Sequence, residues 1–337
     1  MRKRTTLILF IFFPVFSFFF SLCIGVYPIP PHVIVKIIFE KLLEMVTLGK
    51  FNSSSSSLYE TIILQIRLPR IITAMIVGSA LSVSGAVLQA TFRNPLVDSY
   101  IVGISAGAAF GAALAFGFLP MSVEIVAFTF SLFAMFLTYS LAKIRGRATV
   151  ISLILAGIIV NAFYSALTSF LKFLMEHEKL ATIVYYLMGS FANANWNNIK
   201  IISPIVFLGS FIIFLMRWQL NILSLGEQAK ILGCDVEKIR AILIFVVSLM
   251  TSASVAFCGV IGWVGLIIPH IIRMGFGADH KILVPLSISV GASFMVLSDT
   301  LARSLTNFEI PIGILTTLVG IPFFAYLLKK TQGGWNV

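Results

Sequence analysis

The sequence is poor in charged residues, and this shortage narrows the classes of protein that it can encode. Only 11% of its 337 residues are Asp, Glu, Lys or Arg, whereas soluble domains carry about 25%. Hydrophobic residues make up 59% of the chain, and the mean hydropathy is +1.03. A water-soluble fold cannot bury that much apolar surface, so the composition predicts an integral membrane protein whose solvent is largely the bilayer.

Cysteines are few, and the phosphate-binding motif of ATPases is absent. The three cysteines, Cys23, Cys234 and Cys258, have neither the spacing of a disulfide framework nor that of a metal site. No G-x-x-x-x-G-K-[ST] motif occurs, so the chain is not expected to hydrolyse ATP. The four histidines lie apart in the sequence, and we expect no metal, no cofactor and no catalytic residue. The net charge of +11 reports membrane topology rather than nucleic-acid binding.

Long apolar stretches are abundant, and each of them is about as long as a spanning helix requires, roughly 20 residues. The alternating pattern of a β-barrel is missing, so the predicted fold is all-α. The predicted spans are Leu7–Val26, Ile71–Phe92, Leu96–Leu119, Val123–Ala142, Val150–Phe173, Ile199–Met216, Leu283–Leu297 and Ile310–Leu328.

One further apolar run, Ala241–Ile272, is too long for one upright helix and short for two. Arg240 and Arg273 flank it, and the charge rule places both on the cytoplasmic side, so the chain must cross and return. We expect the bend at Gly259–Gly262, followed by a short or broken helix that contains Pro269. The total is then ten spans, with both termini cytoplasmic. The alternative is one long tilted helix.

The basic residues support this orientation. With Arg2, Lys3 and Arg4 inside, 15 of the 24 Lys and Arg residues fall on the cytoplasmic side. The predicted order is a first span at 5–26, an external loop at 27–60, spans two to six at 61–216, a cytoplasmic loop at 217–240 and spans seven to ten at 241–330. All of them form one membrane domain, 1–337, which we expect in a prokaryotic cytoplasmic (inner) membrane.

Two predicted spans carry small residues at every fourth position, which places those residues on one helix face. Small side chains let helix backbones approach closely within lipid, so both helices are expected inside a bundle. The residues are Ala74, Gly78, Ser82, Ala86 and Ala90 in one span, and Gly103, Gly107, Gly111 and Ala115 in the other.

The fifth span instead carries a polar stripe of Asn161, Ser165 and Ser169. Such a stripe must face protein or water. It serves either hydrogen bonding between helices or the lining of a solute path. Gly313 and Thr317 of the last span are the predicted partners in that path.

The cytoplasmic segment 217–240 predicts two short surface helices joined at a glycine. Ser224-Leu-Gly-Glu227 has the spacing of a capping box, Gly233 suits a left-handed helix end, and Asp235 can cap a second helix. The segment is either a solvated connector or a knob on which a partner docks.

Several blocks, in order over residues 60–330, carry a family resemblance. They are Arg67-Leu-Pro-Arg70, Gly78–Gly85 with Gln89, Arg93-Asn-Pro-Leu96, Leu225-Gly-Glu227 with Leu232-Gly233, Gly259–Gly265 with Pro269-His270, Asp279-His280, Ala302-Arg303, Glu309–Gly313 and Gly320–Phe324. Together they resemble the FecCD/BtuC-type permease subunits of binding-protein-dependent ABC importers for iron-siderophore, heme and cobalamin.

The resemblance implies ten helices per subunit and a homodimer whose central path is lined by the fifth and tenth helices. It implies three further partners: a dimeric cytoplasmic ATPase, an extracytoplasmic solute-binding protein and membrane lipid. The ATPase would dock on the coupling loop at Ser224, Gly226, Glu227, Leu232 and Gly233. Arg67, Arg70 and Arg303 would meet acidic residues of the binding protein, although without the resemblance Arg67 and Arg70 read as lipid-headgroup anchors.

The predicted gate is Thr149 and Ser152, at the cytoplasmic start of the fifth helix, because the resemblance implies small hydroxyl residues there. The expected function is uptake of a metal chelate by alternating access. A ferric siderophore is the first expectation, with heme, cobalamin or a molybdate- or tungstate-type oxyanion as alternatives. The rival functions are an ion-coupled secondary transporter, which would need ionisable residues in mid-span, and an intramembrane enzyme.

Overall fold

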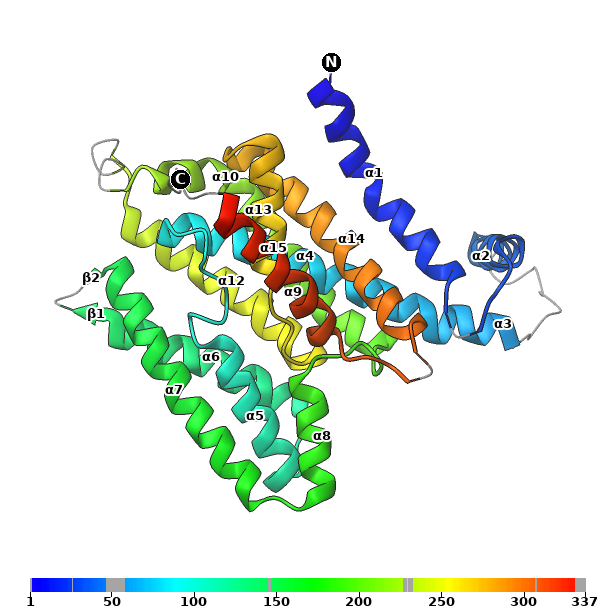
Figure 1. Cartoon of the computed structure of the whole chain (residues 1–337), viewed down its shortest axis with the longest axis horizontal. Coiled ribbons are helices and arrows are strands. Elements are labelled where there is room, and N and C mark those ends of the chain that lie inside the picture. The colour runs from blue at the N-terminus through cyan, green and yellow to red at the C-terminus, as the bar shows by residue number, and fades with distance from the viewer. Residues whose placement is uncertain are drawn as a thin grey trace.

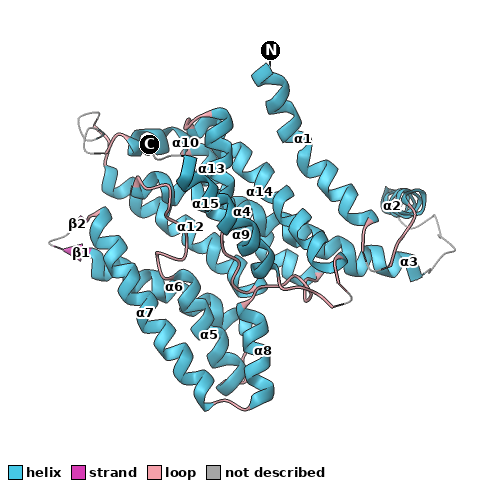
Figure 2. Cartoon of the chain, in the orientation of Figure 1, coloured by secondary structure: helices cyan, strands magenta, loops and turns pink. Residues whose placement is uncertain are grey.

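The computed structural model describes residues 2–25, 27–46, 58–144, 147–226, 229, 233–306 and 308–330. Nearly all of these residues are helical (Figure 1, Figure 2). One short antiparallel pair, β1 (Lys143–Ile144) with β2 (Arg147–Ala148), joins two of the helices and was not predicted. The all-α class expected from composition is confirmed.

The long helices follow the apolar stretches of the sequence, and additional short helices lie in the connections between them. A π-helical segment, η1, joins α3 to α4, so that the chain is helical without a break from Leu58 to Phe92. The elements are α1 (Arg2–Cys23), α2 (Pro31–Val46), α3 (Leu58–Thr61), η1 (Ile62–Arg67), α4 (Leu68–Phe92), α5 (Ile104–Phe118), α6 (Val123–Ala142), α7 (Val150–Leu174), α8 (His177–Leu187), α9 (Trp196–Leu215), α10 (Arg217–Ser224), α12 (Val236–Cys258), α13 (Val264–Phe276), α14 (His280–Ser304) and α15 (Ile312–Lys330).

Six described helical stretches have the length and composition to cross a membrane, and four apolar helices are shorter. The six are Leu58–Phe92, Val123–Ala142, Val150–Leu174, Trp196–Leu215, Val236–Cys258 and His280–Ser304. The four are Phe12–Cys23, Ile104–Phe118, Val264–Phe276 and Ile312–Tyr326.

The predicted break within Ala241–Ile272 is confirmed. Helix α12 ends at Cys258, residues 259–263 are irregular, and α13 begins at Val264 with Pro269 inside it. Gly259 has φ +71°. A Cβ atom placed on Gly259 would lie only 2.0 Å from the carbonyl oxygen of Tyr186, so a side chain has no room at this bend.

The predicted span Leu96–Leu119 is wrong at its start, because α5 begins only at Ile104. Arg93 adopts the left-handed conformation (φ 49°) and ends α4, and Pro95 disfavours helical backbone at the residue before it. The apolar composition of residues 96–103 suited a helix, but these local signals leave them as an irregular segment.

The segment 217–240, predicted to be a cytoplasmic loop, also differs from its prediction. Ser224 is the last residue of α10 rather than a helix cap, and its hydroxyl donates to the carbonyl of Asn221. Gly233 has the predicted positive φ (+75°). Asp235 caps a helix as predicted, accepting from the Lys238 amide, but that helix is the long α12 and not a separate short one. The segment 27–60, predicted to be an external loop, contains a helix, α2.

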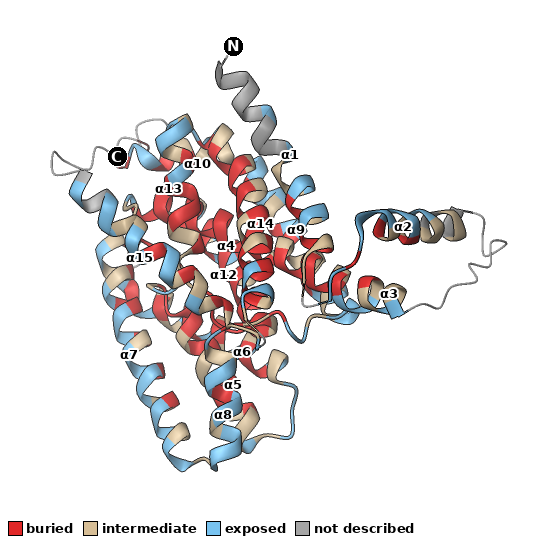
Figure 3. Cartoon of the chain, turned by 45° about the vertical axis from the view of Figure 1, so that its right-hand side comes forward, coloured by how far each residue is buried: buried red, intermediate tan, exposed pale blue. Residues whose placement is uncertain are grey.

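Helices α4, α12 and α14 form the buried centre of the fold, and α7 and α9 lie at its edge (Figure 3). The five small residues predicted to bury one face of α4 are all buried, as expected. In α5, Gly107 and Gly111 pack directly against the backbone of α6, while Gly103 precedes the helix.

Helices α4 and α14 approach each other closely where they cross, at Gly78 and Gly291. A Cβ on Gly78 would lie 2.3 Å from the Gly291 carbonyl oxygen, and one on Gly291 would lie 2.5 Å from the Gly78 oxygen. The two backbones are therefore in van der Waals contact with no space for a methyl group.

We predict that Gly78→Ala destabilises the protein by about 1–3 kcal/mol, because the added methyl group must push α4 and α14 apart. The measurement is the midpoint of thermal unfolding of the purified chain in detergent. Gly275→Ala in α13 is the matched control, since a Cβ there meets nothing within 4 Å and alanine favours helix. Equal midpoints for the two variants would contradict the prediction.

Candidate functional site

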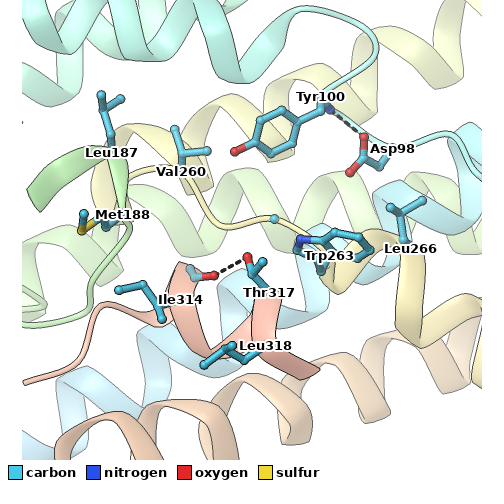
Figure 4. Close-up of a pocket in the computed structure, with 12 residues that line it drawn as sticks. Asp98, Tyr100, Leu187, Met188, Val260, Trp263, Leu266, Ile314, Thr317 and Leu318 are labelled. Atoms are coloured by element: carbon cyan, nitrogen blue, oxygen red, sulfur yellow. Dashed lines mark hydrogen bonds between the residues drawn. The ribbon is translucent and has the colours of Figure 1, made fainter. Parts of the chain in front are cut away.

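A cavity of about 510 Å³ lies where irregular segments of the chain meet near the middle of the fold (Figure 4). Its wall comes from the segment after α4, the end of α8, the α12–α13 junction and the first turns of α15. Apolar and aromatic side chains predominate. The lining residues are Asp98, Tyr100, Leu187, Met188, Val260, Gly262, Trp263, Leu266, Gly313, Ile314, Thr317 and Leu318.

Trp263 fixes the α12–α13 junction against α15. It adopts a left-handed conformation (φ 73°) directly before α13. A Cβ on Gly320 would lie 2.6 Å from the indole ring, so the glycine makes room for it, and the ring centroid of Phe324 lies 5.8 Å away. The indole therefore holds one wall of the cavity to the helix that forms another.

Asp98 and Tyr100 are held by local hydrogen bonds within the segment 93–103. The Asp98 carboxylate accepts from the Tyr100 amide at 3.0 Å, and this bond is drawn in Figure 4. The Tyr100 carbonyl in turn accepts from the side-chain amide of Asn161 in α7. This turn presents an aromatic ring and a mostly buried carboxylate at the cavity wall.

The structure brings some of the predicted path residues together. Gly313 and Thr317 line the cavity, and the Thr317 hydroxyl donates to the Gly313 carbonyl at 2.6 Å. The side-chain amide of Asn161 donates a hydrogen bond to the carbonyl of Tyr100, which is a residue of the cavity wall. Ser165 and Ser169 do not line the cavity, and both are exposed on α7.

Sequence reasoning missed Asp98, Tyr100, Met188 and Trp263 as wall residues. The segment with Asp98 and Tyr100 was assigned to a helix, which hid its role. The Gly-rich block around Trp263 marked a bend, and a bend between two spans was a usable signal for the cavity.

Thr149 and Ser152, the predicted gate, form the N-terminal capping box of α7. The Thr149 hydroxyl accepts from the Ser152 amide at 3.1 Å, and the Ser152 hydroxyl accepts from the Thr149 amide at 3.0 Å. A capping box satisfies free amides at a helix start, which explains both residues without a gate. The gate remains a prediction.

Arg67, Arg70 and Arg303 converge on a second pocket of about 400 Å³ at the end of the fold that contains the start of α4 and the end of α14. Arg70 pairs with two carboxylates, Asp299 and Glu309, and both ion pairs have a shortest N–O distance of 2.7 Å. The Asp299 side chain is almost fully buried, and the Nε of Arg303 lies 3.7 Å from it.

The other two guanidinium groups bond to the end of α1 and the turn after it. Arg67 donates to the backbone carbonyls of Leu22 and Tyr27, and Arg303 donates to the Ser21 carbonyl and hydroxyl. All three arginines therefore have partners within the chain. The three arginines lie together, as predicted, but their guanidinium groups are bonded within the chain rather than free. Docking of a binding protein on them stays a prediction.

The arginine cluster is connected to the cavity through two loops. Glu309 accepts from the Ser190 hydroxyl at 3.1 Å, and the Ser190 amide donates to the Cys258 carbonyl at 2.9 Å. Next to these residues, the Gly313 amide donates to the carbonyl of Met188 at 2.9 Å. The loops that contain Ser190 and Glu309 and the cavity wall thus share one hydrogen-bonded framework.

A third pocket, of about 600 Å³, lies at the opposite end, beside α10 and the predicted coupling loop. Trp218, Asn221, Ile222, Leu225 and Cys234 line it. Gly226 and Gly233 flank this region with positive φ angles of +66° and +75°. Glu227 and Leu232, also predicted at the coupling surface, lie outside the described residues.

We predict that Arg70→Ala destabilises the protein by about 3–5 kcal/mol, because Asp299 is left as a buried charge without its main partner. Glu309→Gln is the comparison, since Glu309 is a quarter exposed and loses only its charge. Chemical or thermal unfolding of both variants is the measurement. An Arg70→Ala protein as stable as the Glu309→Gln protein would show that the cluster has no structural role.

Substitution of Thr149 separates capping from gating. Thr149→Ala removes the cap and should cost about 0.5–2 kcal/mol, whereas Thr149→Asn keeps a capping oxygen and should retain stability. We expect substrate uptake to follow stability in both variants. A Thr149→Asn protein of normal stability that no longer transports would instead favour the gate.

Comparisons with known proteins agree on one protein family. The model of the FecCD transport family matches residues 11–330. The molybdate import system permease protein MolB of Haemophilus influenzae is 44% identical over 284 residues, which is 82% of this chain and 84% of that protein. The hemin transport system permease protein HmuU of Yersinia pestis is 37% identical, with 84% of this chain and 87% of that protein covered.

A solved structure agrees with the fold as well. It describes an inward-facing conformation of a metal-chelate type ABC transporter, and it is 37% identical to this chain with a TM-score of 0.85. The alignment covers 97% of this chain and 99% of that one. The chain therefore belongs to the FecCD transport family, and it is the membrane-embedded, non-catalytic permease subunit of an ABC importer.

Proposed function

We propose that this permease subunit takes up a metal chelate by alternating access, through the cavity between the α12–α13 junction and α15. The observation that carries the proposal is the position of that cavity. Irregular backbone within a membrane is tolerated where it lines a cavity, and three such segments meet there. A separate ATPase would supply the energy by binding the two access states with different affinity.

Ten helices would cross the membrane: α1, α4, α5, α6, α7, α9, α12, α13, α14 and α15. In Figure 1 the start of α1 lies at the top, α10 and the end of α15 at the upper left, and the β1–β2 pair at the left. Helix α2 lies at the right and α8 at the bottom, on the other side of the helices. This arrangement supports cytoplasmic termini on the side of α10, in a prokaryotic inner membrane.

A second copy of the chain would complete the path. Ser165 and Ser169 are exposed on α7 among apolar side chains, and polar groups within a bilayer are normally covered by protein or water. A homodimer with α7 and the cavity facing the partner copy removes this conflict.

The cavity wall favours a bulky chelate over a bare oxyanion. Among its described lining residues, Asp98 is the charged one, and Tyr100 and Trp263 supply aromatic surface. A carboxylate repels an anion, whereas a chelate arrives with its metal already coordinated and offers apolar surface. We therefore propose a ferric siderophore first, with heme or cobalamin next and a molybdate- or tungstate-type oxyanion last.

The arginine cluster would receive acidic side chains of the solute-binding protein. Charge-assisted contacts between Arg and carboxylate are geometrically specific. The internal bonds of Arg67, Arg70 and Arg303 require that a docking carboxylate add to the cluster or replace Glu309. At the opposite end, the pocket beside α10 would receive the ATPase.

The rival function, an ion-coupled secondary transporter, would use an ionisable residue in mid-span, and Asp98 is the described carboxylate at the cavity. Asp299, the most buried described carboxylate, is instead paired with Arg70 near one end of α14. Membership of the FecCD transport family favours the ABC importer over this rival.

The test is uptake into proteoliposomes that contain the permease with its cognate ATPase and binding protein. We expect ATP-dependent uptake of a radiolabelled ferric siderophore. Thr317→Trp should lose most of this uptake, because the indole fills the cavity. Val319→Trp, at an exposed position of the same helix outside the cavity, should retain it.

Uptake that persists without the ATPase would overturn the proposal, as would equal uptake by the two tryptophan variants. Transport of hemin or molybdate in place of the siderophore would retain the mechanism and correct the substrate.

A further inference from the structure

Helix α10 is fastened to the start of α14 by the side chain of Asn221. The side-chain amide donates to Asp279 Oδ1 at 2.8 Å. The side-chain oxygen accepts from the His280 amide at 2.9 Å and lies 2.8 Å from His280 Nδ1. Because an amide oxygen only accepts, the proton of the neutral His280 ring must be on Nδ1. One asparagine thus holds two consecutive residues of the other helix.

Neighbouring contacts strengthen this connection. Lys281 lies over the Trp218 ring, with 4.7 Å between its Nζ and the ring centroid. Asp279 is the N-cap of α14 and accepts from the Lys281 amide. The bond from the Lys281 amide has the largest effect on the pKa of the Asp279 carboxyl, the bond from Asn221 has the next largest, and both lower it. Asp279 therefore stays ionised at neutral pH.

Helix α10 lies between α14 and the pocket assigned to the ATPase. Trp218 and Asn221 line that pocket and also contact the start of α14. A partner that presses on the pocket therefore presses on residues that bind α14.

Helices α14 and α4 form a closely packed pair that reaches the arginine cluster. Helix α14 has 25 residues, a length of about 37 Å at 1.5 Å per residue. Along this length it contacts the α4 backbone at Gly78 and Gly291, and the Ser79 hydroxyl donates to the Ile288 carbonyl at 3.0 Å. At the far end Asp299 pairs with Arg70 of α4 at 2.7 Å.

We propose that Asn221 is a positioning residue that couples α10 to α14, so that α14 and α4 together carry the motion of the ATPase face to the arginine cluster. The proposal rests on the proposed function, because it assigns the ATPase to the α10 pocket. Energetic coupling needs an element that both sites can bias, and the helix pair contacts both.

The test compares three variants in proteoliposomes with ATPase and binding protein: Asn221→Ala, Asn221→Asp, and the exchange Asn221→Asp/Asp279→Asn. The readout is stimulation of ATP hydrolysis by the binding protein, relative to the basal rate. Asn221→Ala should lose most of the stimulation, taken as the ratio to the basal rate of the same variant. Asn221→Asp should behave in the same way, because two carboxylates then face each other.

The exchange variant should regain stimulation. It restores an amide donor opposite a carboxylate acceptor, and asparagine at position 279 still caps α14. Asn197→Ala, at an exposed asparagine outside these contacts, is the matched control and should behave as the original protein.

Normal stimulation in Asn221→Ala would overturn the inference, and so would an exchange variant as impaired as Asn221→Asp. If Asn221→Ala fails to assemble with the ATPase, the comparison of Asn221→Asp with the exchange variant decides. Failure of the proposed function would appear differently, as an original protein without ATP-dependent uptake.

Discussion

The contact between the backbones of α4 and α14 is the constraint on which the rest of the architecture depends. Two glycines at one crossing allow the helices to touch, and the Arg70–Asp299 ion pair joins the same two helices near one end. The same two helices carry the arginine cluster at one end and meet α10 at the other. In a membrane, where apolar side chains gain little by leaving lipid, such close packing is the main source of helix association.

The sequence could predict the long apolar helices well because lipid imposes length and apolarity on a spanning helix. The break at Gly259–Gly262 was predictable because the apolar run between Arg240 and Arg273 is too long for one upright span. The start of α5 was not, because residues 96–103 are apolar yet irregular. Hydrophobic content cannot distinguish a lipid-facing helix from an irregular segment that is buried in protein. The local signal in the sequence was Pro95, which disfavours helical backbone at the residue before it.

The candidate site was predictable in part. Gly313 and Thr317 were found because small and polar residues on one helix face imply a path. Trp263 and Tyr100 were missed, since their position depends on contacts between distant segments that no local pattern records. The arginines were identified by the family resemblance, but their partners Asp299 and Glu309 depend on tertiary packing. Ser224 shows the opposite error, because a residue predicted to begin a helix is instead the last residue of one, α10.

The irregular junction 259–263 has a consequence for how permeases of this architecture diversify. The Gly259 amide still donates to the Val255 carbonyl, and the Trp263 carbonyl accepts from the Ile267 amide. Residues 260–262 between them lie outside both helices, and so a polar cargo that touches this junction has main-chain groups within reach. Main-chain groups are the same whatever the amino acid. Mutation of the surrounding side chains can therefore reshape the chamber for a new cargo without removing its polar lining, which allows one scaffold to evolve toward chemically dissimilar nutrients.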